Sequence, residues 1–268
     1  MAFALTDEQQ ELRSVVERYL RQALPLDRLA TIADSAAGWD PLSWGELSAM
    51  GWTGVTIPLE LGGAGLGYVE QALVLEEMGR SLYSGPYLAT VLAVPALSDE
   101  EQVDVAEGKT RWSVEVDGVV PDLDRVDRVV TATGAAVASG TVAPGIDPTR
   151  PVGRLDVEDR YPLPGAIDPA VLLLSLAAEA LGVGRRALEI GVAYAKEREQ
   201  FGRSIGSYQA VSHELADSFA DLELARSLVY SAAWSLSNRP TAAFRAASIA
   251  KAFVTDAAVS AVERAIQV

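Results

Sequence analysis

A stretch around residue 200 combines residue types that suit the binding of an anion. It lies between two runs of helical periodicity, and Gly202 and Gly206 allow the chain to turn there. Arg198 precedes the turn and Ser207 is placed to cap the helix that follows, so we expect a guanidinium and free backbone N–H groups to lie together. Phe201 adds a ring for stacking, which a nucleotide needs in addition to contacts with its phosphates.

The same residues are compatible with a second interpretation. Arg198 would then complement the negative C-terminal end of the preceding helix, Phe201 would fill the turn, and the amide of Gln209 would be solvated instead of bound to a nucleotide. In the first interpretation the segment is a ligand-binding corner, and in the second it only connects two helices. Physical properties alone leave both open.

Composition excludes several classes of function. The formal net charge of −15 would repel nucleic acid and anionic membranes over most of the surface, so we expect neither as a partner. The chain has no cysteine, which excludes thiolate sites, and its single histidine, His213, argues against a zinc site or a serine–histidine triad. We therefore predict no metal site and interpret His213 as a residue on a helix surface.

The sequence predicts a cytoplasmic protein. Its first residues lead directly into a helix, without the basic segment and apolar run of a signal peptide. The longest apolar run, residues 170–181, is interrupted by Ser175 and Glu179 and is shorter than the ~18 residues that a membrane span needs. We interpret this run as a buried helix.

Residues 1–108 are predicted to form an N-terminal helical domain. A capping box at residues 6–9 indicates the start of an amphipathic helix. Further helices are expected at about residues 41–50 and 70–82. Between these two, residues 57–67 contain four glycines and a proline, a composition that is incompatible with a helix and predicts a loop.

Residues 109–165 are predicted to form a small middle β domain. Alternating apolar residues at 112–116 run into Asp117 and Gly118, which indicates a strand followed by a turn. Residues 126–142 are rich in valine, threonine and alanine without helical periodicity, and prolines interrupt the segment that follows. The fold class is therefore mostly α with a small β insert.

Residues 166–268 are predicted to form a C-terminal bundle of three long helices. In each helix the apolar residues step by three and four, which is typical of a helix that packs along one seam. Because up-and-down bundles normally close with four helices, we expect a further helix from another subunit or from residues beyond Val268. The seam of the first helix is Leu173, Leu176, Ala180, Val183, Ala187, Ile190 and Tyr194; that of the third includes Phe244, Ala247, Val254, Ala258, Ala261 and Ala265.

Two motifs resemble those of the acyl-CoA dehydrogenases. The pattern R-x-x-F-G-x-x-I-x-x-x-Q, which starts at Arg198, is similar to the family's flavin-binding corner, and residues 57–80 resemble its N-terminal helical domain. In that family the corner reaches across a subunit interface to the FAD of the neighbouring chain. The resemblance implies FAD as the cofactor and Arg198, Gln200, Phe201, Tyr208 and Gln209 as its ligands, with Gln267, near the end of the third long helix, as a further one.

The chain departs from the family pattern in its middle domain and at the catalytic base. The family's flavin-cradling motif, which resembles T-E-x-x-x-G-S-D, has no match between Arg111 and Tyr161. One of the two family positions for the glutamate base corresponds to Leu172, and the other would lie beyond Val268. We therefore assign no catalytic residue in this chain.

The resemblance implies a subunit of an FAD-dependent acyl-CoA dehydrogenase, an oxidoreductase that desaturates an acyl-CoA thioester. The part of the flavin site that a family member builds from its own middle domain is missing here. The chain therefore resembles the reduced subunit of the heteromeric dehydrogenases of actinobacterial steroid side-chain breakdown. We expect a fuller homologous subunit as partner, in a heterotetramer with two copies of each, and an acyl-CoA with a bulky acyl group as substrate. Two alternatives stay open: a flavin-dependent monooxygenase on the same fold, and a helical scaffold without catalysis.

Overall fold

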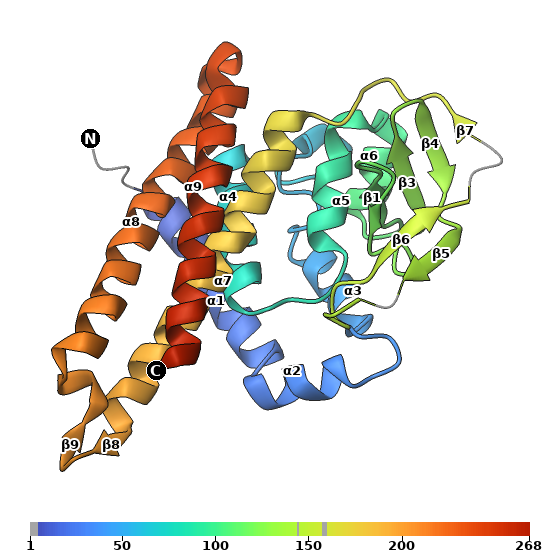
Figure 1. The fold of residues 1–268 in the computed structure, drawn as a ribbon. Helices are drawn as coiled ribbons and strands as arrows, with labels where there is room; N and C mark the ends of the chain where they lie inside the picture. Colours follow the sequence, from blue (N-terminus) through green and yellow to red (C-terminus); the bar gives the residue numbers. More distant parts are fainter. Residues whose placement is uncertain (1–4, 144, 157–159) are drawn as a thin grey trace. The chain divides into compact units, whose positions relative to one another are not determined.

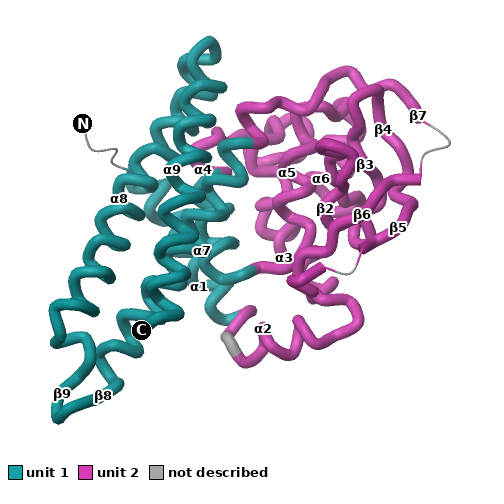
Figure 2. The backbone as a smooth tube through the Cα atoms, in the orientation of Figure 1, with its two compact units in different colours: residues 1–22, 72–82, 173–268 teal, residues 23–71, 83–172 magenta. Residues whose placement is uncertain are grey.

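The computed structural model describes residues 5–143, 145–156 and 160–268 (Figure 1). The chain divides into two compact units, each built from segments that are separated in the sequence (Figure 2). Unit 1 comprises residues 1–22, 72–82 and 173–268, and unit 2 comprises residues 23–71 and 83–172. The predicted division at residues 108 and 165 stays a prediction.

Unit 1 is helical. It contains α1 (Asp7–Ala23), most of α4 (Tyr68–Arg80) and of α7 (Pro169–Glu197), and the whole of α8 (Gln209–Asn238) and α9 (Pro240–Gln267). The predicted capping box at the start of α1 is confirmed: the Thr6 amide donates to Oε1 of Gln9 at 3.0 Å, and the Gln9 amide donates to Oγ1 of Thr6 at 3.3 Å. None of the helices in the described ranges is long and apolar enough to cross a bilayer.

Small residues let the long helices of unit 1 approach one another closely. Helices α8 and α9 lie side by side along much of their length (Figure 1), and their facing residues are mainly alanine and valine. A Cβ added at Gly184 of α7 would lie 2.9 Å from Cα of Ala258 and 2.9 Å from Cδ2 of Leu222. The absence of a side chain at Gly184 therefore brings α7 into contact with both α8 and α9.

Helices α4 and α7 cross through a pair of glycines. A Cβ at Gly182 would lie 1.9 Å from the carbonyl oxygen of Glu76, and a Cβ at Gly79 would lie 2.0 Å from the carbonyl oxygen of Glu179. At this crossing the backbones of α4 and α7 are in direct contact, with no side chain between them. A side chain at either glycine would push the two helices apart and loosen the packing of the residues around the crossing.

We expect Gly182→Ala to lower the free energy of unfolding by about 1–3 kcal/mol, because the added methyl group has no space between the two backbones. The control is Gly45→Ala in the exposed middle of α3, where a Cβ meets nothing within 4 Å. There the substitution should be neutral or stabilise by up to about 1 kcal/mol. Urea denaturation of both variants measures the difference, and equal stabilities would contradict the close crossing.

Unit 2 combines short helices with two small sheets. Its helices are α2 (Leu26–Ala33), α3 (Leu42–Ala49), η1 (Leu59–Leu61), α5 (Tyr87–Ala93), η2 (Val94–Ala96) and α6 (Asp99–Ala106). One sheet has the order β1 (Trp112–Val114), β3 (Arg128–Thr131), β4 (Gly134–Val137), β7 (Arg160–Tyr161). The other has the order β2 (Val120–Pro121), β6 (Val152–Leu155), β5 (Gly140–Ala143). The predicted small β insert is confirmed.

The core of unit 2 joins its sheet to its helices. Trp112 is 1% exposed and packs in a cluster with Ile57, Leu92 and Val130. The indole N–H of Trp112 donates to Oγ1 of Thr110 at 3.2 Å, so the ring is buried without an unsatisfied donor. Strand β1 pairs with β3 in parallel and the other pairs are antiparallel.

The predicted seam of α7 is not its buried stripe, since Leu176, Ile190 and Tyr194 are 37%, 45% and 49% exposed. The predicted seam of α9 is buried at Ala247, Val254, Ala258 and Ala261, and only its first residue, Phe244, is exposed, at 58%. The buried residues of α7 form a neighbouring stripe, because this helix packs on α4, α8 and α9 through residues that lie one position away from the predicted seam. The buried stripe is Ala170, Val171, Leu174, Ala177, Ala178, Leu181, Leu188 and Ala195.

Candidate functional site

The predicted corner is a short hairpin between α7 and α8. Strands β8 (Glu199–Gln200) and β9 (Arg203–Ser204) pair in antiparallel register, and η3 (Ile205–Ser207) leads into α8. The two residues of the turn, Phe201 and Gly202, have φ angles of +54° and +80°. Positive φ at both positions is the conformation of a type I′ turn, which fits the twist of the two flanking strands.

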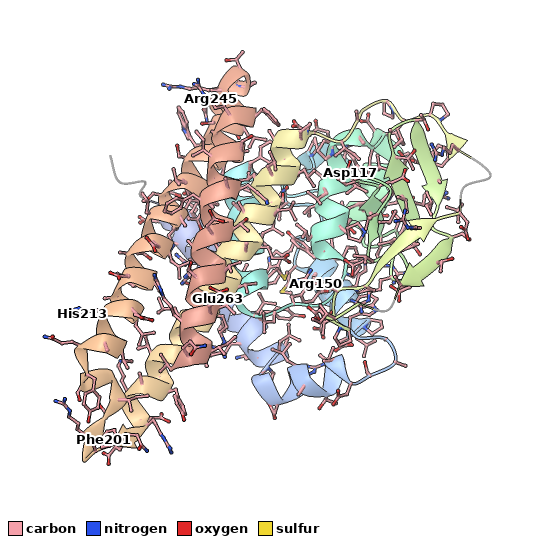
Figure 3. All side chains as sticks on the ribbon, in the orientation of Figure 1. Asp117, Arg150, Phe201, His213, Arg245 and Glu263 are labelled. Atoms are coloured by element: carbon pink, nitrogen blue, oxygen red, sulfur yellow. The ribbon has the colours of Figure 1, made fainter. Side chains whose placement is uncertain are left out.

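Phe201 lies at the tip of this hairpin, at the end of the helical unit (Figure 3). Its side chain is 93% exposed, so the interpretation in which the ring fills the turn is wrong. A non-glycine residue at positive φ is strained by about 1–3 kcal/mol. The chain therefore holds an apolar ring in solvent in a costly conformation, which is a reason to look for an external contact.

Arg198 presents an unpaired guanidinium at the base of the hairpin. Its amide donates to the carbonyl of Tyr194 and its carbonyl accepts from the amide of Ile205, each at 2.8 Å, so the backbone is fixed. The side chain is exposed, and within the described residues it makes no hydrogen bond or ion pair. Because the backbone is held and the guanidinium is free, Arg198 is available to an anion from outside the chain.

The structure brings five of the six predicted ligands to this corner. The side chains of Gln200 and Gln209 are exposed there, while the hydroxyl of Tyr208 donates to the carbonyl of Gln200 at 3.0 Å. The guanidinium of Arg203 lies 3.9 Å from the centre of the Tyr208 ring. This cation–π contact stabilises the position of β9, which contains Arg203. Gln267, the sixth, is exposed at the last turn of α9, which ends toward the same end of the unit as the hairpin (Figure 1).

Ser207 does not cap α8, and that prediction is wrong. Its hydroxyl donates to the carbonyl of Ser204 at 2.7 Å, and the N-cap position is taken by Tyr208, which makes no side-chain capping bond. The hydroxyl is used inside η3 because that turn supplies a nearer acceptor. The N-terminus of α8 thus lacks a side-chain acceptor for its first N–H groups, which leaves them suited to an anion.

A second polar cluster in unit 1 was not found by sequence reasoning. Glu76 and Glu77 on α4 are 0% and 1% exposed, yet both carry carboxylates. Their partners come from α1, α4, α7 and α8: Arg13 (3.2 Å from Glu76 and 3.0 Å from Glu77), Arg226 (3.3 Å from Glu76), Arg80 (3.3 Å from Glu77), Arg185 and Tyr230. The adjacent acids in an otherwise apolar stretch of helix are the sequence signal that could have indicated it.

The charges of this cluster decide the protonation of Glu76. Burial alone would raise the pKa of Glu76, but the guanidinium groups of Arg185, Arg13 and Arg226, together with the hydroxyl of Tyr230, outweigh burial and hold that pKa below its ordinary value. Burial and the adjacent carboxylate raise the pKa of Tyr230 well above its ordinary value, so its hydroxyl stays a donor. A carboxylate with a lowered pKa and several donors is a poor proton acceptor. We assign this cluster to stability and not to catalysis.

The structure also describes the surroundings of other residues that the sequence analysis considers. His213 is exposed on α8 (Figure 3), as expected of a surface histidine. In the parts of the chain that the structure covers, no group of three or more histidine, aspartate or glutamate side chains is arranged to hold a metal ion. Leu172 packs against the apolar cluster of unit 2 that contains Trp112.

Comparison with known proteins identifies related chains. A model of the acyl-CoA dehydrogenase N-terminal domain matches residues 6–102, and a model of the acyl-CoA dehydrogenase C-terminal domain matches residues 174–268. Acyl-CoA dehydrogenase IpdE2 of Mycobacterium tuberculosis is 37% identical over 240 residues, which are 83% of this chain and 74% of that protein.

Two solved structures are similar over nearly the whole fold. A variant of the Tcur3481–Tcur3483 steroid ACAD has a TM-score of 0.86 at 27% identity, with 97% of this chain and 86% of that chain covered. The ChsE4–ChsE5 complex from Mycobacterium tuberculosis has a TM-score of 0.81 at 25% identity, with 100% and 86% covered. Both comparisons agree with a mostly helical fold that carries a small β region.

The groups at the corner also fit the flavin nucleotide that the resemblance implies. An unpaired guanidinium and two exposed amides suit the oxygens of a pyrophosphate and the polar edge of a ring system, and the exposed ring of Phe201 offers a stacking surface. Two domain models, a relative that is 37% identical and the shared fold lead to one conclusion. This chain belongs to the acyl-CoA dehydrogenase family.

Proposed function

We propose that this chain is a subunit of an FAD-dependent acyl-CoA dehydrogenase and that it contributes half of a flavin site to a homologous, fuller partner subunit. The observation that carries the proposal is the hairpin between α7 and α8, where the guanidinium of Arg198 and the ring of Phe201 are exposed without partners in the described part of the chain. The two structures named above, each described under a pair of subunit names, support a heteromeric assembly.

Each residue of the corner has a proposed task. Arg198 binds the pyrophosphate, and the amides of Gln200 and Gln209 donate to polar atoms of the cofactor. Phe201 packs on the cofactor and excludes water from it, while Tyr208 holds the hairpin in place through its bond to the carbonyl of Gln200. Gln267 is a further contact from the end of α9. When bound, FAD supplies the acceptor for the hydride that leaves the acyl chain.

We propose that the proton is removed by the partner and not by this chain. Leu172 stands at one of the two positions where family members carry the glutamate base, and an apolar side chain accepts no proton. We further propose two copies of each subunit, an acyl-CoA with a bulky, steroid-derived acyl group as substrate, a place in lipid or steroid catabolism, and a cytoplasmic location. The division at residues 108 and 165 into N-terminal, middle and C-terminal domains is part of the same proposal.

The test is to measure flavin and activity in the presence and absence of a partner. We expect the chain purified alone to contain little FAD and to turn over no acyl-CoA, because it supplies only one half of the site. Co-expression with a fuller homologous subunit should give a complex with bound FAD that acyl-CoA reduces under anaerobic conditions. Stoichiometric FAD or turnover in the lone chain would contradict the proposal.

A further inference from the structure

A pocket lies within unit 2, beside the ends of strands β1 and β3. Its volume is about 460 Å³, which is within the range of about 300–1,000 Å³ that is usual for sites of small organic molecules. Three segments line the pocket: Glu115, which follows β1; the turn 131–134, which joins β3 to β4; and parts of the segment 162–167, which leads to α7. All of them belong to one compact unit.

Hydrogen bonds hold the polar walls of this pocket in place. The amide of Glu115 donates to the carbonyl of Val130 at 2.8 Å, which fixes the backbone after β1 against β3. The hydroxyl of Thr131 donates to the carbonyl of Gly134 at 2.9 Å and closes the turn. These groups are therefore positioned before any ligand binds.

The opposite wall is apolar and is anchored to the core of unit 2. Leu163 and Ile167 are partly buried and pack against the cluster that contains Trp112. The amide of Gly165, between them, donates to the carbonyl of Ala96 at 3.2 Å. The pocket thus offers a fixed apolar surface on one side and polar groups on the other, as is usual in sites of small organic ligands.

Glu115 is the charged residue of the lining, and its carboxylate has no partner. The side chain is half-buried and makes no hydrogen bond or ion pair with any residue of the described ranges. The guanidinium of Arg160 reaches the same turn, but it donates to the hydroxyl of Thr133 at 2.6 Å and does not pair with Glu115. A carboxylate that is partly removed from water beside apolar side chains is stabilised when a positive group binds to it.

We propose that this pocket binds a primary amine with an apolar body, through an ion pair between the ammonium group and the carboxylate of Glu115. The ammonium group donates hydrogen bonds, and the carboxylate accepts them. The hydroxyls of Thr131 and Thr133 are already engaged, so Glu115 supplies the free polar group. The apolar body packs on Leu163 and Ile167. An anionic ligand is disfavoured, because Glu115 repels it.

This proposal is independent of the flavin half-site. The pocket uses only residues of unit 2, and the hairpin at residues 199–204 belongs to unit 1. Neither proposed ligand contacts a residue that the other one needs. Loss of amine binding would leave the proposed role of the hairpin unchanged, and the two proposals can therefore fail separately.

The experiment compares three probes that share a phenyl ring and differ in the head group: 2-phenylethylamine, 2-phenylethanol and phenylacetate. Each is titrated into the full chain at neutral pH, and binding is followed by proton NMR of the probe. We expect the amine to bind with a Kd of about 1 mM, a value that a ligand of this size can reach. The alcohol should bind at least about tenfold more weakly, and phenylacetate more weakly still. No binding of the amine, or equal binding of amine and alcohol, would overturn the proposal.

Two variants test whether the amine binds in this pocket. Glu115→Gln keeps the shape of the side chain and should weaken amine binding at least about tenfold, to the level of the alcohol. Ala166→Phe adds a ring to an exposed position of the lining and should block all three probes. Amine affinity equal to that of wild type in either variant would overturn the proposal.

Asp117→Asn is the matched control, since it removes a carboxylate outside the pocket. Asp117 is exposed in the turn after β1 (Figure 3), at a φ of +51° that asparagine also tolerates. This variant should bind the amine like wild type, and a loss of binding equal to that of Glu115→Gln would show a general effect of charge and overturn the site. Circular dichroism should show the same helix content in every variant, so that a change in affinity reports the pocket and not the fold.

Discussion

Replacing Glu76 by glutamine is expected to lower the free energy of unfolding by about 3–5 kcal/mol. The amide has nearly the volume of the carboxylate but leaves the guanidinium groups of Arg13, Arg185 and Arg226 without the charge that balances their burial. Removing one member of a buried ionic cluster is more costly than removing the whole cluster, because the remaining charges stay desolvated. Urea denaturation at neutral pH measures this effect.

The same variant should change how stability depends on pH. The pKa of Glu76 is lowered in the folded chain, so this residue contributes its full stability above its unfolded pKa of about 4.3 and loses that contribution as the pH falls through the folded pKa. The free energy of unfolding of wild type should therefore approach that of Glu76→Gln as the pH is lowered into the acid range. Glu11→Gln, on the exposed face of α1, is the control and should change stability by less than about 0.5 kcal/mol. A difference between wild type and Glu76→Gln that is independent of pH would contradict this account.

Replacing Arg198 by alanine is expected to weaken FAD binding to the complex with the partner subunit by about ten- to a hundredfold. A charge-assisted hydrogen bond to a phosphate contributes about 1.5–3 kcal/mol, and the guanidinium of Arg198 has no competing partner among the described residues. Arg198→Lys should recover only part of the loss, because an ammonium keeps the charge but cannot engage two oxygens in one plane. Titration of FAD into the apo complex measures both.

The alternative role of Arg198 predicts a different result. An arginine that only complements the C-terminus of α7 contributes about 0.3–1 kcal/mol, and lysine would serve nearly as well there. Light scattering should first establish that each variant still assembles with its partner. Arg245→Ala, near the other end of the helical unit (Figure 3), is the control and should bind FAD like wild type. Unchanged affinity of Arg198→Ala in an intact complex would remove the corner from the flavin site.

Features with local signals could be predicted from the sequence. The capping box at Thr6 is confirmed, because it depends on residues within one turn of the helix. The corner at residues 198–209 is also confirmed as a turn between two long helices. For the β region, the sequence predicted that strands exist but not their order, since the pairing of β1 with β3 depends on contacts beyond the local pattern.

Features that depend on distant residues could not be predicted. The adjacent acids Glu76 and Glu77 resemble a solvated helix face until Arg185 and Arg226 are brought against them from more than one hundred residues away. The prediction of which residues of α7 are buried was wrong for a related reason. The helix has two apolar stripes, and periodicity does not indicate which of them is buried. The exposure of Phe201 likewise follows from the hairpin, whose turn type a phenylalanine does not indicate.

The discontinuous construction of unit 1 has a consequence for the order in which the chain folds. Helices α8 and α9 are joined by a single residue, Arg239, so their contact closes almost no loop. The contacts of Glu76, in contrast, span 63 residues to Arg13, 109 to Arg185 and 150 to Arg226. Loop-closure entropy makes such distant contacts late events in folding. We therefore expect the α8–α9 pair to form first, as a local nucleus. Residues 83–172 of unit 2 lie between the unit 1 part of α4 and that of α7, so we expect the contacts of Glu76 with Arg185 and Arg226 to form later.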